Sequence, residues 1–159
     1  MLFIQAAVGN SAISGKGLFT QEPVKRGTVV SIHAVDSVVV TEEQYQEEQR
    51  KGNELAIRTG IRWVGKYFLY ARESRPEAFI NHSTNPSLLY HCGISFARRD
   101  LEAGAELTID YSLFLAEEDV DSFSDSKVDT QVTGLPAKEA LLSSTQQLLR
   151  LLNEISEIR

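Results

Sequence analysis

Residues 79–83 of this 159-residue chain have the sequence Phe-Ile-Asn-His-Ser. The first two residues are expected to enter an apolar core, and the polar residues Asn81 and His82 follow at once. Polar groups at such a position are either hydrogen-bonded or functional. On this stretch alone, a hydrogen-bonded turn is the favoured interpretation and a binding site is the alternative. A catalytic pair of Ser83 and His82 is not expected, because neighbouring residues on a strand point to opposite faces.

Two further stretches stand out on either side of this one. Residues 14–17 (Ser-Gly-Lys-Gly) predict a tight turn, because glycine permits positive φ and close backbone approach. This turn lacks both the third glycine of a dinucleotide loop and the Gly-Lys-Ser/Thr ending of a phosphate loop, so by itself it indicates a hairpin. Residues 106–111 (Glu-Leu-Thr-Ile-Asp-Tyr) predict a strand that ends at Tyr111, which by itself could be a core residue.

The remainder of the chain up to Leu115 alternates short strand-like runs with turn signals, which is typical of a β-rich fold. A helix is predicted from Thr41 to about Lys51, with Thr41 as its cap. Single strands are predicted over residues 62–70 and 88–97.

The order and spacing of residues 14–19, 79–83, 97–101 and 106–111 resemble the SET domain family, over roughly residues 2–115. The resemblance implies a mainly β, SET-type fold of several small curled sheets with a C-terminal pseudoknot, to which this chain adds a C-terminal amphipathic helix. Threading of the C-terminal segment beneath a loop is an exception to the usual rule against threaded chains. It would bring residues 79–83 and 106–111 together. The implied division is 1–115 as the SET domain, 116–135 as an acidic linker and 136–159 as the helix.

The resemblance also implies the site. The turn would hold the methionine part of S-adenosyl-L-methionine through its backbone, Asn81 and His82 would hold the amino group and adenine, and Tyr111 would be the catalytic tyrosine. The implied cofactor-binding residues are Ser14, Gly15, Lys16, Gly17, Asn81 and His82. The implied activity is that of a protein-lysine N-methyltransferase, which transfers a methyl group to the side-chain amine of a lysine in a protein substrate. The alternative is a catalytically silent SET-like module that binds a protein or peptide.

The chemistry of this transfer fits the residue types. A methyl group on a sulfonium is already electrophilic, so no metal is expected. The lysine nitrogen must be neutral although its reference pKa is ~10.4. A narrow apolar channel lowers that pKa because it disfavours the ammonium form. Tyr111 could then orient the amine, so that positioning and electrostatics carry the rate.

The chain departs from the common family pattern at Ala78, Thr84 and Ser87, where many members have Arg, Cys and Asn. It also lacks the cysteine-rich zinc modules that often flank the domain and complete the lysine channel. Another element must then close the channel, and the candidates are Phe114, Phe123 and the C-terminal helix. A second pocket tyrosine could be Tyr67 or Tyr70, and the sequence leaves this open.

The composition limits which cell compartments and which kinds of binding partner are expected. The single cysteine, Cys92, excludes an internal disulfide and a multi-cysteine zinc cluster, and it fits an intracellular (cytoplasmic or nuclear) protein. No signal peptide or membrane span is expected. The net charge of −6 lies mainly in residues 116–135, which hold six acids and one lysine. The body is nearly neutral, so direct nucleic-acid binding is not expected. A basic protein substrate such as a histone would be compatible with the acidic segment.

The C-terminal helix carries an apolar stripe, formed by Leu141, Leu148, Leu152 and Ile155. This stripe is expected to be buried either against the body, where it could cap the lysine channel, or against a second copy. Leucines at seven-residue spacing suit helix–helix contacts, which favours a homodimer.

Overall fold

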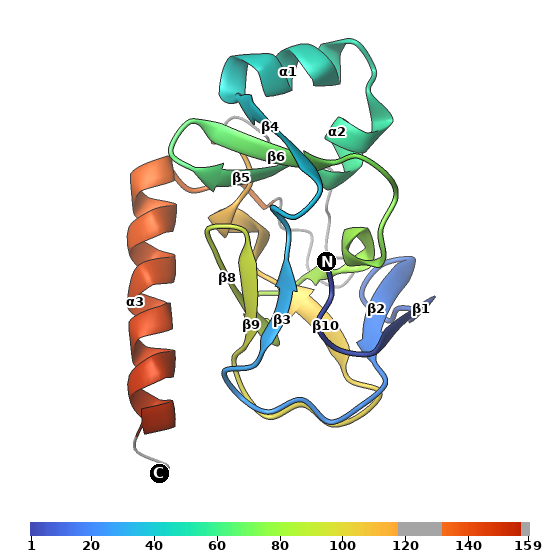
Figure 1. Cartoon of the computed structure of the whole chain (residues 1–159), viewed down its shortest axis with the longest axis vertical. Coiled ribbons are helices and arrows are strands. Elements are labelled where there is room, and N and C mark those ends of the chain that lie inside the picture. Colours follow the sequence, from blue (N-terminus) through green and yellow to red (C-terminus); the bar gives the residue numbers. More distant parts are fainter. Residues whose placement is uncertain (118–131, 157–159) are drawn as a thin grey trace.

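The computed structural model describes residues 1–117 and 132–156. In this part of the chain, three small sheets form the body and a long helix runs along one side (Figure 1). The first sheet has the order β1 (Ala6–Asn10), β2 (Lys16–Thr20), β10 (Glu106–Ile109), β7 (Asn81–His82). The second is β3 (Val29–Ile32), β9 (Ile94–Ala97), β8 (Leu88–His91). The third is β4 (Ser37–Thr41), β6 (Tyr67–Ala71), β5 (Ile61–Val64).

Short helices join these sheets. They are α1 (Glu42–Arg50), α2 (Glu54–Thr59) and the 3₁₀ helices η1 (Pro76–Phe79) and η2 (Tyr111–Leu113). The predicted helix is confirmed as α1, where Thr41 and Gln44 form a reciprocal capping box. The sequence analysis missed α2, which begins because the Asn53 side chain accepts hydrogen bonds from the next turn. The expected mainly β architecture of several small sheets with a C-terminal helix is confirmed.

Two predictions of single strands were wrong. Residues 62–70 are divided between β5 and β6, because Gly65 turns the chain at a φ of 55°. Residues 88–97 are divided between β8 and β9 by Cys92 and Gly93, with φ of 47° and 81°. Each division produces an antiparallel hairpin. Each run that looks like one continuous strand in the sequence is therefore two paired strands.

The core of the body joins the motif strands. Leu18 of β2 and Leu107 of β10 are fully buried and are direct cross-strand partners. On its other side β10 pairs in parallel with β7, which places Thr108 beside Asn81 and Ile109 beside His82. The expected meeting of residues 79–83 and 106–111 is thus observed. Burial of a large aliphatic side chain stabilises by ~1.5–3 kcal/mol, so these contacts hold the motif strands firmly in register.

The long helix α3 (Ala137–Ser156) packs against β8 and η2 (Figure 1). Ala140 and Leu151 are buried there, and the Ser144 hydroxyl lies 3.0 Å from His91 Nδ1. Leu148 and Ile155 of the predicted stripe also pack on the core. The other two members of the stripe, Leu141 and Leu152, face outward instead. The residues that face the body recur at intervals of three and four, which is the true period of a straight helix.

This orientation gives a direct test of how α3 docks. Leu151→Ala should lower the free energy of unfolding by ~2–5 kcal/mol, because Leu151 is only 5% exposed and its loss leaves a cavity. Arg150→Ala is the control and should stay within ~0.5 kcal/mol, because Arg150 is exposed on α3 and is not one of its outward leucines. Urea denaturation measures both. Equal effects of the two substitutions would mean that α3 docks by another face.

Candidate active site

The predicted cofactor turn and Asn81 lie together. The turn between β1 and β2 reaches β7, where the Asn81 side-chain nitrogen donates to the carbonyl oxygens of Ser14 (3.3 Å) and Lys16 (3.1 Å). The same nitrogen donates to Oε1 of Glu106 at 2.9 Å. Gly15 has a φ of 45°, as expected of a tight turn. A side chain at Gly17 would collide with the Glu106 carboxylate, so the glycine lets Glu106 approach the turn.

His82 and Tyr111 form the second contact between the motifs. The Tyr111 backbone N–H donates to His82 Nδ1 at 3.1 Å, and the two rings lie 5.4 Å apart between centroids. The Tyr111 hydroxyl donates to the carbonyl oxygen of Ile80 at 2.6 Å. Asp110 fixes the turn by accepting from the Ser112 backbone. Burial raises the pKa of Tyr111, so the hydroxyl remains protonated at neutral pH and acts as a donor.

Tyr111 also lines a cavity of about 130 Å³. Its walls come from α1, α2, β6, η1 and the segment around η2, and five aromatic residues line it: Tyr45, Tyr70, Tyr90, Tyr111 and Phe114. Desolvation in such a cavity disfavours an ammonium ion and therefore favours a neutral amine.

Of the two tyrosines proposed as the second pocket tyrosine, Tyr70 lines the cavity. Tyr67 is 43% exposed and is not part of the lining. Among the elements proposed to close the channel, Phe114 lies in the wall, and no described residue of α3 does. The third candidate, Phe123, lies outside the described residues. Tyr90 was missed by the sequence analysis, because nothing in the β8 sequence distinguishes it from an ordinary core residue.

Aromatic rings connect the cavity to the motif residues in an unbroken row. Ring centroids are separated by 6.0 Å from His33 to Tyr90, 5.2 Å from Tyr90 to Phe114 and 5.0 Å from Phe114 to Tyr111. Tyr111 then contacts His82. Because ring contacts of this kind are rigid and dense, the row fixes Tyr111 between the cavity and β7.

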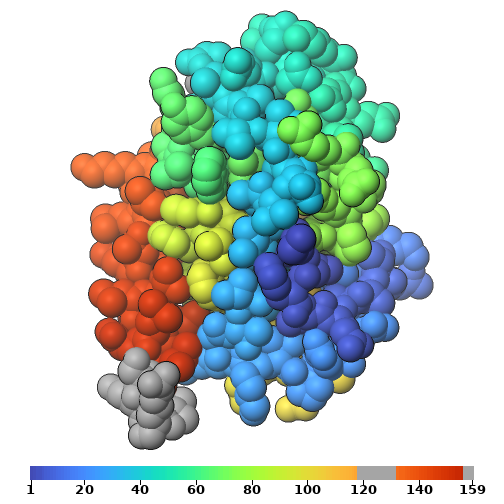
Figure 2. Space-filling model, viewed as in Figure 1, coloured from blue at the N-terminus to red at the C-terminus, as the bar shows by residue number. Residues whose placement is uncertain are grey.

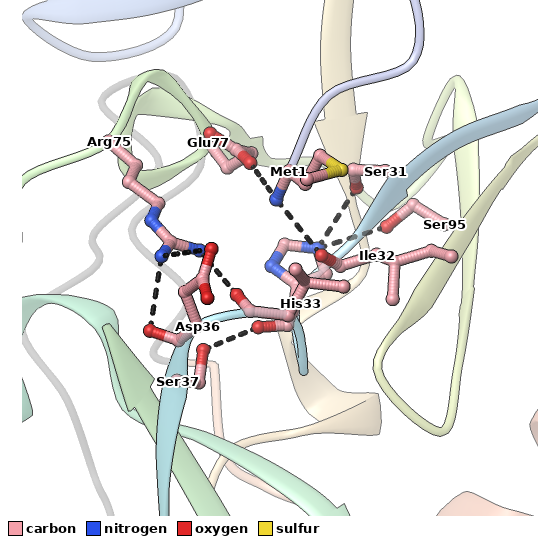
Figure 3. Close-up of polar contacts among 10 residues, drawn as sticks. Met1, Ser31, Ile32, His33, Asp36, Ser37, Arg75, Glu77 and Ser95 are labelled. Atoms are coloured by element: carbon pink, nitrogen blue, oxygen red, sulfur yellow. Dashed lines mark hydrogen bonds and ion pairs between the residues drawn. The ribbon is translucent and has the colours of Figure 1, made fainter. Parts of the chain in front are cut away.

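One wall of the cavity is polar (Figure 3). There His33 Nε2 lies 3.2 Å from the hydroxyls of both Ser31 and Ser95. Burial lowers the pKa of His33 to about 4, so the imidazole is neutral near pH 7.

The contacts of two charged side chains fix the same wall. Glu77 pairs with the amino group of Met1, and Arg75 donates to the carbonyl oxygens of Val35 and Asp36 (Figure 3). These charged groups are already engaged by other parts of the chain, so they hold the wall in place beside the aromatic lining.

Comparison with known proteins places the chain in a family. The family model of the SET domain matches residues 15–112, which is more than half of the chain. The chain therefore belongs to the SET domain family. Members of this family are generally protein-lysine methyltransferases that use S-adenosyl-L-methionine and act on proteins that bear a target lysine. No curated protein matches the chain.

Within residues 1–117 and 132–156, no group of three His, Cys, Asp or Glu side chains is placed to hold a metal ion. No helix in the same ranges has the length and apolar character to span a membrane.

Proposed function

We propose that this chain is an S-adenosyl-L-methionine-dependent protein-lysine N-methyltransferase. The observation that carries the proposal is the position of Tyr111. Its ring contacts His82 on the side of the predicted cofactor residues, and it also lines the aromatic cavity. A residue with these two neighbours can orient a lysine amine that enters through the cavity toward a methyl donor held by the turn.

The residues of the turn fit the methionine end of the cofactor. Asn81 holds the backbone of the turn, because its side-chain nitrogen donates to the carbonyl oxygens of Ser14 and Lys16. In this proposal Ser14, Gly15, Lys16, Gly17, Asn81 and His82 bind the cofactor, and Tyr111 is catalytic. When bound, S-adenosyl-L-methionine supplies a methyl group that is already electrophilic because its sulfur is positively charged.

The chain's own contribution is to orient the amine and exclude water. The aromatic cavity favours the neutral amine over the ammonium ion. The protonated Tyr111 hydroxyl and the nearby Ile80 carbonyl are the polar groups that can align the nitrogen. Alignment and removal of water lower the barrier without a covalent enzyme intermediate.

Calorimetric titration with S-adenosyl-L-methionine tests the cofactor part of the proposal. Saturable one-to-one binding is expected, and S-adenosylhomocysteine should bind the same site. A protein that binds neither compound, yet captures a peptide or protein, would instead be a catalytically silent SET-like module.

We also propose that α3 forms a homodimer contact. Its outward face carries the exposed leucines Leu141, Leu142, Leu149 and Leu152. The α3 side chains form one flank of the molecule in Figure 2. Leu142 and Leu149 are seven residues apart, which suits pairing with the same face of a second copy. At ~25 cal/mol per Å², burial of this apolar face would stabilise a dimer by several kcal/mol.

Light scattering of the full chain is therefore expected to give a dimer mass. Leu149→Glu should shift the protein to monomers. The monomers should still be folded, which a cooperative thermal unfolding transition would show. The exposed polar position Gln146, changed to Glu, is the control and should leave the dimer intact. A full-length protein that stays monomeric at high concentration would contradict this assignment.

A further inference from the structure

Glu106 lies where three segments of the chain meet. It opens β10, and its Oε1 accepts hydrogen bonds from the Ser11 hydroxyl at 2.7 Å and from the Asn81 side-chain nitrogen at 2.9 Å. These two donors lie 95 and 25 residues away in the sequence. Ser11 in turn accepts from the backbone N–H groups of Ile13 and Ser14, at 2.8 and 3.3 Å. Glu106 therefore ties the cofactor turn and β7 to the same strand that ends in Tyr111.

These contacts determine which way the Asn81 amide points. The nitrogen faces three oxygens that accept hydrogen bonds, those of Ser14, Lys16 and Glu106. An amide oxygen turned toward them would face only acceptors, so the opposite orientation is excluded. The Asn81 amide oxygen points away from this group, because all the hydrogen bonds that the Asn81 side chain makes to the described residues use its nitrogen. It is an acceptor left available for a ligand with N–H groups.

We propose that Glu106 is a positioning residue of the cofactor site and acts through Asn81. This inference rests on the proposed function. By holding the nitrogen of the Asn81 amide, Glu106 keeps the amide oxygen directed outward, where it accepts a hydrogen bond from the cationic amino group of the cofactor's methionine end. Such charge-assisted hydrogen bonds are stronger than neutral ones, so the orientation of one amide changes affinity.

The inference predicts which substitutions matter. Glu106→Ala removes the acceptor, and Glu106→Asp keeps the charge but withdraws the carboxylate by one methylene group. Both should weaken the binding of S-adenosyl-L-methionine at least about tenfold. Glu106→Gln should bind within about threefold of the unchanged protein, because its amide oxygen can still accept from Ser11 and Asn81. Both of these hydrogen bonds use Oε1 of Glu106, so the amide nitrogen of the variant can take the place of Oε2.

Three ligands separate positioning from a general loss of structure in calorimetric titrations. S-adenosyl-L-methionine and S-adenosylhomocysteine both carry the amino group, and both should lose affinity in the Ala and Asp variants. Methylthioadenosine lacks the whole amino-acid part, so its affinity should be unchanged in every variant. Glu102→Ala is the matched control, because Glu102 is an exposed acid in the preceding turn. It should leave the affinity for all three ligands unchanged.

A double variant tests whether Glu106 acts through Asn81. In the Asn81→Ala background, Glu106→Ala should cause no further loss of affinity, because contacts that act as a unit are not additive. The inference is overturned if Glu106→Asp binds S-adenosyl-L-methionine normally, if methylthioadenosine loses affinity equally, or if the double variant shows additive losses. Failure of the unchanged protein to bind S-adenosyl-L-methionine would overturn the proposed function itself, together with this inference.

Discussion

Replacement of Tyr111 by Phe is expected to lower methyl-transfer turnover at least about tenfold, or roughly 1.4 kcal/mol of transition-state stabilisation. The substitution removes the hydroxyl that donates to Ile80, whereas the ring keeps its contacts with Phe114 and His82. Cofactor affinity should therefore remain close to that of the unchanged protein, and the loss should appear in the rate of a single turnover.

Tyr67→Phe is the matched control, because it removes a tyrosine hydroxyl outside the cavity and should leave turnover unchanged. Thermal unfolding of both variants shows whether the fold is preserved. Unchanged turnover in Tyr111→Phe would remove Tyr111 from the catalytic role.

Replacement of Asn81 by Ala is expected to weaken S-adenosyl-L-methionine binding by ~1–3 kcal/mol. The side chain both holds the turn, through Ser14 and Lys16, and offers its amide oxygen to the cofactor. Asn85→Ala provides the comparison, since Asn85 is an exposed residue four positions further along. Calorimetry measures both affinities. If Asn81→Ala binds S-adenosyl-L-methionine as tightly as the unchanged protein, Asn81 only stabilises the turn and does not bind the cofactor.

Much of the candidate site could be predicted because the motifs are local in sequence. The glycines predict the turn at Ser14 to Gly17, and the residues before Tyr111 predict a strand that ends there. The order of these motifs indicates the family. The sheet then places them together, since β10 pairs with β2 on one side and β7 on the other. The roles of these residues toward a cofactor remain proposals that the binding experiments test.

The cavity could not be predicted, because its lining depends on contacts between distant segments. Tyr45 comes from α1, Tyr90 from β8 and Phe114 from the end of η2, and they meet only in the folded chain. The role of Glu106, a residue of the quoted motif, could not be predicted for a related reason. A glutamate at the start of a strand resembles a surface residue, and only its contacts with Ser11 and Asn81 show otherwise.

The face by which α3 packs on the body could not be predicted from the spacing of its leucines. Leucines occur on several faces of this helix, so the sequence supports more than one apolar stripe. The face against the body is set by small residues that permit close approach, such as Ala140 and Ser144, as much as by Leu151. The surplus leucines remain on the outer face, where the proposed homodimer would use them.

The most direct test of the account is methyl transfer itself. The full chain is incubated with a cell lysate and S-adenosyl-L-methionine that carries a deuterated methyl group, and tryptic peptides are analysed by mass spectrometry. We expect deuterated methyl groups on lysine side-chain nitrogens, dependent on the added chain and formed at least about tenfold more slowly with Tyr111→Phe. Absence of labelled lysine from every protein, with a chain that is folded and binds the cofactor, would contradict it.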